Sequence, residues 1–199
     1  MKVLVACEYS GVVRDAFLAR GHVALSCDLL PTDVPGPHYQ GDVRDLFEKE
    51  WDLMIVHPPC TYLCLSGLHW NNRIPGRREK TDEALAFVKF LLEAPVPRIC
   101  LENPVGAISK HIRKSDQIIQ PWQFGHPESK QTALWLKNLP LLQPTNILEP
   151  IAFQENGKPR WNNQTPTGQN KLGPSKDRWK LRSTTCKGIA DAMATQWSF

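Results

Sequence analysis

Short apolar runs alternate with segments of helical periodicity along most of the chain. The apolar runs are typical of buried strands, and we expect strands at residues 2–7, 22–27, 52–56, 98–101 and 131–136. Helical periodicity predicts helices at residues 12–20, 45–50, 84–92, 108–114 and 188–197. In the last of these, Ile189, Met193 and Trp197 recur at four-residue steps, which is typical of a face packed into a core. The alternation predicts an α/β fold with a mostly parallel sheet and helices on both faces.

Local signals set the expected ends of these elements. Gly21 is a candidate C′ glycine for the first helix, and Thr81-Asp82-Glu83 is the expected N-terminal cap of the helix at 84–92. Residues 62–78 are predicted to form a loop, either a lid that carries positive charge or a surface excursion. Residues 140–182 lack periodicity and are rich in Pro, Asn, Gln, Gly and Lys, so we expect long loops with room for a short hairpin.

The first strand, helix and second strand form a predicted nucleotide-binding βαβ unit. Tyr9-Ser10-Gly11 makes the first turn, where backbone N–H groups can hold a polar ligand. Asp28 closes the second strand, where an acid can accept hydrogen bonds from two ribose hydroxyls. The fingerprint Gly-x-Gly-x-x-Gly is absent, which favours a ligand without phosphates over NAD. Asp42 follows a third short strand and is either a helix-capping residue or a contact for an adenine amino group.

A cysteine and a carboxylate are predicted to meet at one edge of the sheet. Pro58-Pro59 ends the strand at 52–56 because proline donates no backbone hydrogen bond, and Cys60 follows at once. Glu102-Asn103 lies just beyond the strand at 98–101. The carboxyl ends of strands in an open α/β sheet are where ligands bind. Beside a nucleoside pocket, this pair indicates thiolate addition to an electron-poor ring, with the glutamate bound to the amidine edge of the ring.

Length and composition fit one globular domain at residues 1–199. Of the 199 residues, 41% are hydrophobic, and no apolar run is long enough to cross a bilayer. The chain enters a strand at once, so no leader peptide is visible, and we expect a cytoplasmic protein without a membrane partner. The six cysteines lack Cys-x-x-Cys spacing, which favours reduced thiols over a disulfide or zinc framework, and we expect no metal site.

The net charge of +4 is unevenly distributed. Residues 1–150 hold 16 Lys or Arg against 17 Asp or Glu, whereas residues 151–199 hold 8 against 3. A basic C-terminal quarter suits contacts with phosphates, and a solvated polar loop explains the charge equally well.

The residues singled out above resemble DNA cytosine-5 methyltransferases, in the order of that family and through most of the chain. Pro58-Pro59-Cys60 is similar to the nucleophile motif of the family, and Glu102-Asn103-Pro104 is similar to its Glu-Asn-Val. The resemblance implies a Rossmann-like S-adenosylmethionine-dependent methyltransferase fold in a small stand-alone enzyme, like the short members found in bacteriophage genomes. It also implies that Cys60 adds to C6 of cytosine, that Glu102 binds the N3/N4 edge, and that C5 takes the methyl group.

The resemblance assigns further positions to the cofactor and to the substrate. Tyr9-Ser10-Gly11 is similar to the Phe-x-Gly cofactor loop, and Asp28 matches the acid that binds the ribose of S-adenosylmethionine. Asp42-Val43 resembles the adenine-contacting Asp-Ile, and Lys130 stands where the family has the first arginine of Arg-x-Arg. The resemblance therefore implies a catalytic set and a cofactor-binding set, namely Cys60, Glu102, Asn103 and Lys130, and Tyr9, Ser10, Gly11, Asp28, Leu29, Asp42, Val43 and Pro58.

Three features of the sequence depart from the family pattern: one substitution, one missing motif and one shortened region. Thr132 replaces the second arginine, and Ser183-Thr184-Thr185 is the nearest polar substitute for a missing Gly-Asn-x-Val. Only residues 140–182 fill the place of a target-recognition domain, so strong sequence specificity is hard to supply. Basic residues there could contact nucleic acid, with Trp161 or Trp179 either stacking on bases or anchoring the loop.

We therefore expect methylation of single- or double-stranded DNA with little sequence specificity. A cytosine nucleotide or RNA is the alternative substrate, because the recognition region is so short. A non-catalytic nucleic-acid binder is the remaining alternative, which the loss of the second arginine allows.

Overall fold

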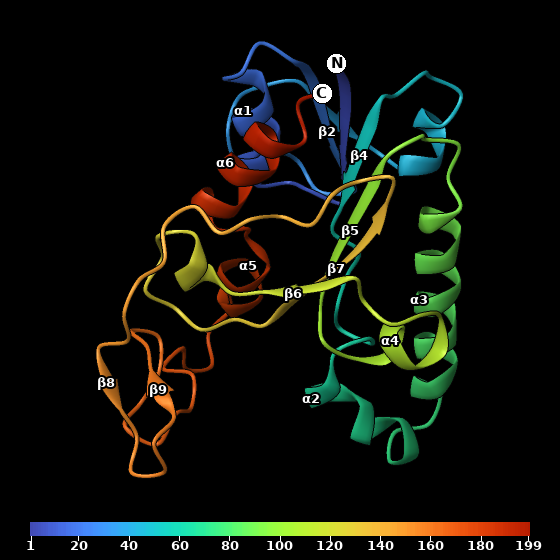
Figure 1. Cartoon of the computed structure of the whole chain (residues 1–199). Helices are drawn as coiled ribbons and strands as arrows, with labels where there is room; N and C mark the ends of the chain where they lie inside the picture. Colours follow the sequence, from blue (N-terminus) through green and yellow to red (C-terminus); the bar gives the residue numbers. More distant parts are fainter.

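A computed structural model describes residues 1–199 and has a seven-stranded sheet at its centre (Figure 1). The strand order is β3-β2-β1-β4-β5-β7-β6. The strands are β1 (Lys2–Ala6), β2 (Val23–Asp28), β3 (His38–Gln40), β4 (Leu53–Val56), β5 (Ile99–Pro104), β6 (Gln117–Ile119) and β7 (Thr132–Lys137). Strands β1 to β5 pair in parallel, and β7 runs antiparallel to both of its neighbours. The order of β1 to β5 is that of a doubly wound fold, which confirms the predicted Rossmann-like α/β class.

Helices cover both faces of this sheet, as predicted (Figure 1). The α-helices are α1 (Val12–Leu18), α2 (Leu65–Leu68), α3 (Arg77–Leu92), α4 (Ala107–His111), α5 (Arg178–Ser183) and α6 (Lys187–Gln196). The 3-10 helices are η1 (Val43–Leu46), η2 (His69–Asn72) and η3 (Pro121–Gln123). None of these helices has the length and the apolar composition that a membrane crossing requires.

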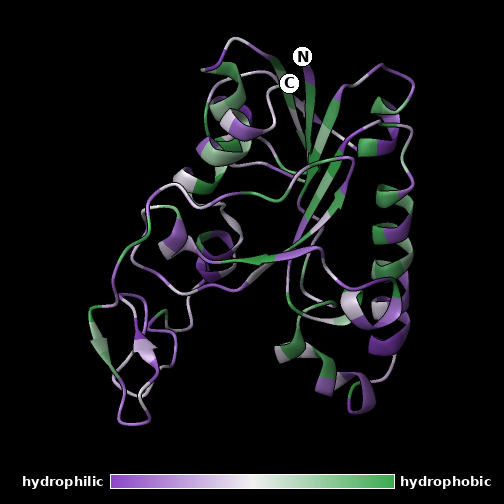
Figure 2. Cartoon of the chain, in the orientation of Figure 1, coloured by the Kyte–Doolittle hydropathy of each residue, from purple (hydrophilic) through white to green (hydrophobic).

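The hydrophobic core has two parts, one on each face of the sheet, and Figure 2 shows the central strands as its apolar spine. Alternation along β1 divides the two, because Val3 and Val5 face α1 and α6 whereas Leu4 faces α3. The predicted apolar face of the last helix is confirmed, since Ile189, Met193 and Trp197 are all buried in the first part. Helix α6 thus packs beside α1 and covers the same face of the sheet.

The helix expected at 84–92 begins earlier than predicted, at Arg77. Its N-cap is Gly76 with φ of 74°, a conformation that glycine adopts without steric cost. Thr81 does not cap the helix, so that prediction is wrong. The Thr81 hydroxyl is buried inside the helix and donates to the carbonyl oxygen of Tyr62 at 3.1 Å. A tertiary contact has therefore taken the hydroxyl that the sequence signal assigned to a cap.

The segment at 62–78 is not a plain loop, because α2 and η2 lie within it. The backbone N–H of Ala107, the first residue of α4, donates to the carbonyl oxygen of Leu63 at 2.7 Å, and the N–H of Leu65 donates to the carbonyl oxygen of Val105 at 3.4 Å, so this segment is joined to the turn between β5 and α4. Gly106 makes the close approach possible, since a Cβ there would lie 1.9 Å from the Leu63 oxygen. Packing against the end of β5 therefore orders a segment that has no clear periodicity of its own.

Strand β5 extends through Pro104, so Glu102 and Asn103 lie inside a strand rather than just beyond one. The cause is the antiparallel partner β7, which pairs Leu134 with Glu102 and Ala133 with Asn103. Such pairing fixes the direction of each side chain by the pleat of the sheet. The carboxylate is therefore held more rigidly than the sequence analysis predicted.

The region at 140–182 contains the short hairpin that the sequence left room for, formed by β8 (Ala152–Phe153) and β9 (Pro159–Arg160). It also contains α5 from Arg178, which the sequence analysis did not predict. Trp161 is buried and stacks on Trp122, with ring centroids 5.2 Å apart and planes at 7°. Trp161 therefore anchors this region to the rest of the protein and is not exposed for stacking on a base.

Trp197 gives a direct test of the core beside α6. Its side chain is fully buried, and its indole N–H donates to the carbonyl oxygen of Pro140 at 3.1 Å. We expect Trp197→Ala to lower the free energy of unfolding by roughly 3–5 kcal/mol, because it opens a large cavity. Phe153→Ala is the control, since this side chain is 69% exposed, and should change stability by about 0.5 kcal/mol or less. Chemical denaturation measures both, and equal losses would contradict the proposed packing.

Candidate active site

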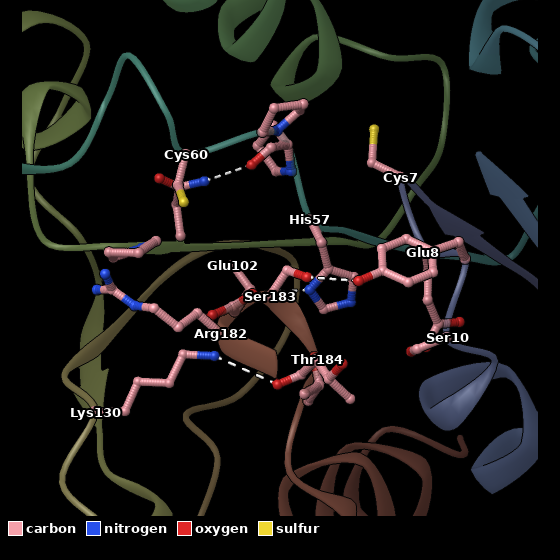
Figure 3. A pocket seen from close by; sticks show the side chains of 16 residues that line it. Cys7, Glu8, Ser10, His57, Cys60, Glu102, Lys130, Arg182, Ser183 and Thr184 are labelled. Carbon is pink, nitrogen blue, oxygen red and sulfur yellow. Dashed lines mark hydrogen bonds and ion pairs between the residues drawn. The ribbon is translucent and has the colours of Figure 1, made fainter. Parts of the chain in front are cut away.

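A cleft opens where the carboxyl ends of β1, β4 and β5 meet (Figure 3). The strand order reverses between β1 and β4, and ligands of doubly wound sheets bind at such a switch point. The lining comes from five parts of the chain: the turn after β1, the loop after β4, the end of β5, the segment before β7 and the segment around α5. These residues are Cys7, Glu8, Tyr9, Ser10, His57, Pro58, Pro59, Cys60, Glu102, Asn103, Pro104, Lys130, Arg182, Ser183, Thr184 and Thr185.

Cys60 lies in the loop that follows β4 and lines the cleft. Its carbonyl oxygen accepts hydrogen bonds from the N–H groups of Leu63 and Cys64, both at 3.0 Å, which closes a tight turn. Burial raises the pKa of the Cys60 thiol, the neighbouring Cys64 and Glu102 raise it further, and Lys130 opposes them. The thiol is therefore mostly protonated at neutral pH, and its attack on a ring requires that the proton be taken up elsewhere.

Glu102 is buried on the floor of the cleft. The Nδ1 of His57 lies 2.8 Å from its Oε2, and each of the two side chains is only 10% exposed. Burial by itself would raise the pKa of Glu102, but the hydrogen bond and charge of His57, together with Lys130, hold it below the usual value. Glu102 is accordingly a carboxylate, so the His57 Nδ1–H is the donor.

Asn103 joins the two strand ends that carry Cys60 and Glu102. Its Nδ2 donates to the carbonyl oxygen of Pro58 at 2.7 Å, and the Asn103 side chain is buried. Its Oδ1 has no partner within the protein. The hydrogen bond fixes the Pro58-Pro59-Cys60 loop against β5, which makes Asn103 a structural support of this loop.

Lys130 approaches the cleft from the segment before β7. Its Nζ donates to the carbonyl oxygen of Thr184 at 3.4 Å, and its charge lowers the pKa of Cys60, Cys186 and Glu102. The expectation that Lys130 lies with Cys60 and Glu102 is met by this geometry. Thr132 is buried, and its hydroxyl donates to the Lys130 carbonyl oxygen, so no second cation lies beside Glu102 on this strand.

The turn after β1 binds its own helix through Glu8. The buried Glu8 carboxylate accepts hydrogen bonds from the N–H groups of Val13 at 2.7 Å and Arg14 at 3.2 Å. These are the donors that a phosphate would use at a helix N-terminus. An internal carboxylate therefore blocks a phosphate from this position, in agreement with the predicted preference for a ligand without phosphates.

Gly11 is required at this turn for two reasons. Its φ is 75°, and a Cβ would lie 2.5 Å from a guanidinium nitrogen of the buried Arg14. Arg14 in turn donates to Ser26 Oγ at 3.2 Å and to the Pro35 carbonyl oxygen at 3.3 Å. The glycine thus leaves room for a buried arginine, which holds the segment between β2 and β3 beside the turn.

The predicted cofactor residues fall into two groups. Tyr9, Ser10 and Pro58 line the cleft, whereas the others lie outside its lining, at Gly11, Asp28, Leu29, Asp42 and Val43. Asp28 and Asp42 both lie near the Cys27 thiol, whose pKa is raised to about 12 by burial and then by the charges of these two carboxylates. The Asp42 carboxylate is itself paired with the Arg44 guanidinium at 2.7 Å.

Two of the outlying residues have local roles of their own. The Asp42 carboxylate accepts from the Arg44 N–H at 2.9 Å, so the helix-capping alternative is realised. Val43 is 4% exposed and packs in the core, whereas Leu29 is 73% exposed. A contact of Asp42, Val43 or Leu29 with adenine remains a prediction.

The sequence analysis did not place Cys7, Glu8 or His57 in the cleft, and it gave Arg182 only as one of the basic residues that could contact nucleic acid. His57 directly precedes Pro58 at the end of a buried strand, which is a signal that could have been used. Arg182 belongs to α5 and could not be placed without the path of the C-terminal region. In the same segment the hydroxyls of Ser183 and Tyr9 share a hydrogen bond of 2.8 Å, which ties α5 to the turn after β1.

Comparison with known proteins gives little further information. No protein-family profile matches the chain, and no curated protein matches it. Among solved structures the chain is similar to an rRNA methylase from Escherichia coli, with 14% identity and a TM-score of 0.38. The match covers 68% of this chain and 55% of that one, so the chain spans about half of that protein. A likeness at this level establishes no family, and the function rests on the geometry of the cleft.

The charge of Lys130 gives a testable effect on Cys60. We expect Lys130→Gln to raise the pKa of the thiol and to slow its alkylation by iodoacetamide by up to about tenfold, since one pKa unit changes the thiolate fraction tenfold. Peptide mass spectrometry isolates Cys60 from the other cysteines. Lys49→Gln is the control, because Lys49 precedes β4 at the opposite edge of the sheet. Equal rates in both variants would contradict this electrostatic account.

Proposed function

We propose that this protein transfers a methyl group from S-adenosylmethionine to C5 of cytosine in DNA, through a covalent bond from Cys60 to C6. The observation that carries the proposal is the convergence of Cys60, Glu102 and Lys130 in one cleft, at the switch point of a Rossmann-like sheet. A nucleophile, a carboxylate for the ring edge and a nearby cation are the groups that such an addition needs.

The residues of the cleft fit the cofactor in two respects. Glu8 occupies the helix N-terminus where a phosphate would bind, and S-adenosylmethionine has no phosphate. Asp28 lies at the end of β2, where an acid can accept hydrogen bonds from ribose hydroxyls. Tyr9 and Ser10 line the cleft together with Cys60, and we assign them to the methionine end of the cofactor. When bound, the cofactor supplies an electrophilic methyl group.

The protein groups account for the activation of the ring. Cys60 adds to C6, and electron density moves toward N3 and onto C5. Glu102 binds the N3/N4 edge and stabilises the adduct, because its carboxylate is already held in place by His57. A base then removes the C5 proton, and the thiolate leaves with restoration of the aromatic ring. The chain thereby returns to its starting state.

Nucleic acid is the substrate that the surroundings of the cleft support. Arg182 and Lys130 line the cleft as cations, and Trp179 is 55% exposed, with its ring centroid 5.6 Å from that of Tyr9. Trp179 is thus the aromatic surface available for stacking, whereas Trp161 is buried. A flipped base needs both phosphate contacts and a stacking surface to repay its removal from a duplex.

Transfer of labelled methyl groups tests the proposal. The protein is incubated with S-adenosylmethionine labelled in the methyl group and, in turn, with duplex DNA, single-stranded DNA, RNA and dCMP. We expect label in DNA at C5 of cytosine and a loss of at least about a thousandfold in Cys60→Ala, because the nucleophile is absent.

The four substrates separate the alternatives. Equal labelling of dCMP and DNA would indicate a nucleotide-modifying enzyme, and label in RNA alone would move the activity to RNA. Cofactor binding by calorimetry without label in any substrate would contradict methyl transfer. Cys64→Ala is the matched control, since Cys64 lies four residues away outside the lining of the cleft, and it should retain activity.

A further inference from the structure

His57 and Glu102 form a buried pair that the proposed function does not yet use fully. Their side chains come from adjacent parallel strands, with Nδ1 and Oε2 2.8 Å apart. His57 is anchored by its backbone, because its N–H donates to the Ala6 carbonyl oxygen at 3.0 Å. Pro58 and Pro59 then restrict the chain directly after it. The imidazole therefore has a fixed position relative to both Glu102 and Cys60.

The pair also points to a ligand. The His57 side chain is 10% exposed, and its Nε2 is buried without a partner within the protein. In Figure 3 the imidazole lies between Glu102 on one side and the turn with Cys7, Glu8 and Ser10 on the other. Buried polar atoms without partners are rare in native structures, and they concentrate where a ligand binds. His57 thus lies at the boundary between the proposed cofactor side and base side of the cleft.

The addition of a thiol to cytosine poses a proton problem that this pair can solve. The Cys60 thiol loses a proton when its sulfur bonds to C6, and N3 gains one as electron density arrives there. A protonated Glu102 could not accept the first proton. A carboxylate can accept it and then pass it to N3, and because His57 bonds to Oε2 we assign this task to Oε1.

We propose that His57 is a positioning residue that holds Glu102 as an oriented carboxylate, ready to carry the proton of Cys60 to N3 of the target ring. The step is balanced: the S–H bond breaks, the S–C6 bond forms, and one proton moves through Oε1 to N3. Elimination reverses the path once the C5 proton has gone. The catalytic consequence rests on the proposed function, whereas the hold of His57 on Glu102 does not.

Other charges near the pair must be considered in any titration. The titratable groups that line this part of the cleft or lie within range of the Glu102 charge are Cys7, Glu8, Tyr9, Cys60, Cys100, Lys130, Arg182 and Cys186. Of these, Lys130 also lowers the pKa of Glu102, so it stays unchanged in the variants below. Glu8 is engaged by Val13 and Arg14.

Two variants separate positioning from a merely structural role. His57→Ala removes the donor, so the buried Glu102 should have a pKa at least about one unit higher. His57→Asn retains an N–H donor near the Nδ1 position and should recover part of the shift. Carbon-13 NMR of the glutamate carboxyl groups, with Glu102→Gln for assignment, measures the titration without substrate. An unchanged Glu102 pKa in His57→Ala would overturn the inference.

The catalytic consequence is measured by exchange of tritium from C5 of cytosine in DNA, which requires addition of Cys60 to C6. In His57→Ala, the fall in exchange rate toward acid pH should begin at least about one unit higher than in wild type, so that exchange is about tenfold slower on that limb. A uniform loss at all pH values would indicate a structural role and overturn the inference. A shifted Glu102 pKa with no exchange in wild type would instead contradict the proposed function alone.

Discussion

The parallel pairing of β4 with β5 is the constraint on which the cleft depends. Val56 pairs with Leu101, so the next residues along the two strands also lie side by side. His57 consequently meets Glu102 at 2.8 Å, and Pro58 meets Asn103 at 2.7 Å. A slip of one residue would turn Glu102 to the opposite face of the sheet. The register is secured by fully buried side chains on both strands, which makes the core of the protein the support of its chemistry.

The sequence predicted part of the set of residues that meet at the end of the sheet. Pro58-Pro59 marks the end of one strand, and the apolar run before Glu102 marks the next, so local signals placed Cys60 and Glu102 on one rim. Lys130 followed from the resemblance to the methyltransferase family. The α/β class followed from the alternation of strands and helices, because that alternation is a local pattern along the chain, and the Rossmann-like arrangement was implied by the resemblance.

The remaining features depend on contacts between distant segments. The extension of β5 through Pro104 needs β7 as a partner, and the hydroxyl of Thr81 bonds to the distant Tyr62 carbonyl oxygen rather than to the helix N-terminus. Neither contact leaves a local signal. The same holds for Arg182, which reaches the cleft only because α5 packs on the turn after β1. Long-range contacts therefore determine these features, which local sequence propensity does not predict.

The most direct test of the account is the identity of the cysteine that bonds to the ring. The protein is incubated with S-adenosylmethionine and an oligonucleotide containing 5-fluorocytosine. A fluorine at C5 replaces the proton that a base must remove before the thiolate can leave, so the covalent complex is trapped. The complex is then digested and mapped by mass spectrometry. The account predicts one nucleotide-linked peptide, joined through Cys60 and heavier by one methyl group. A linkage through Cys64 or Cys186, or an adduct that persists in Cys60→Ala, would contradict it.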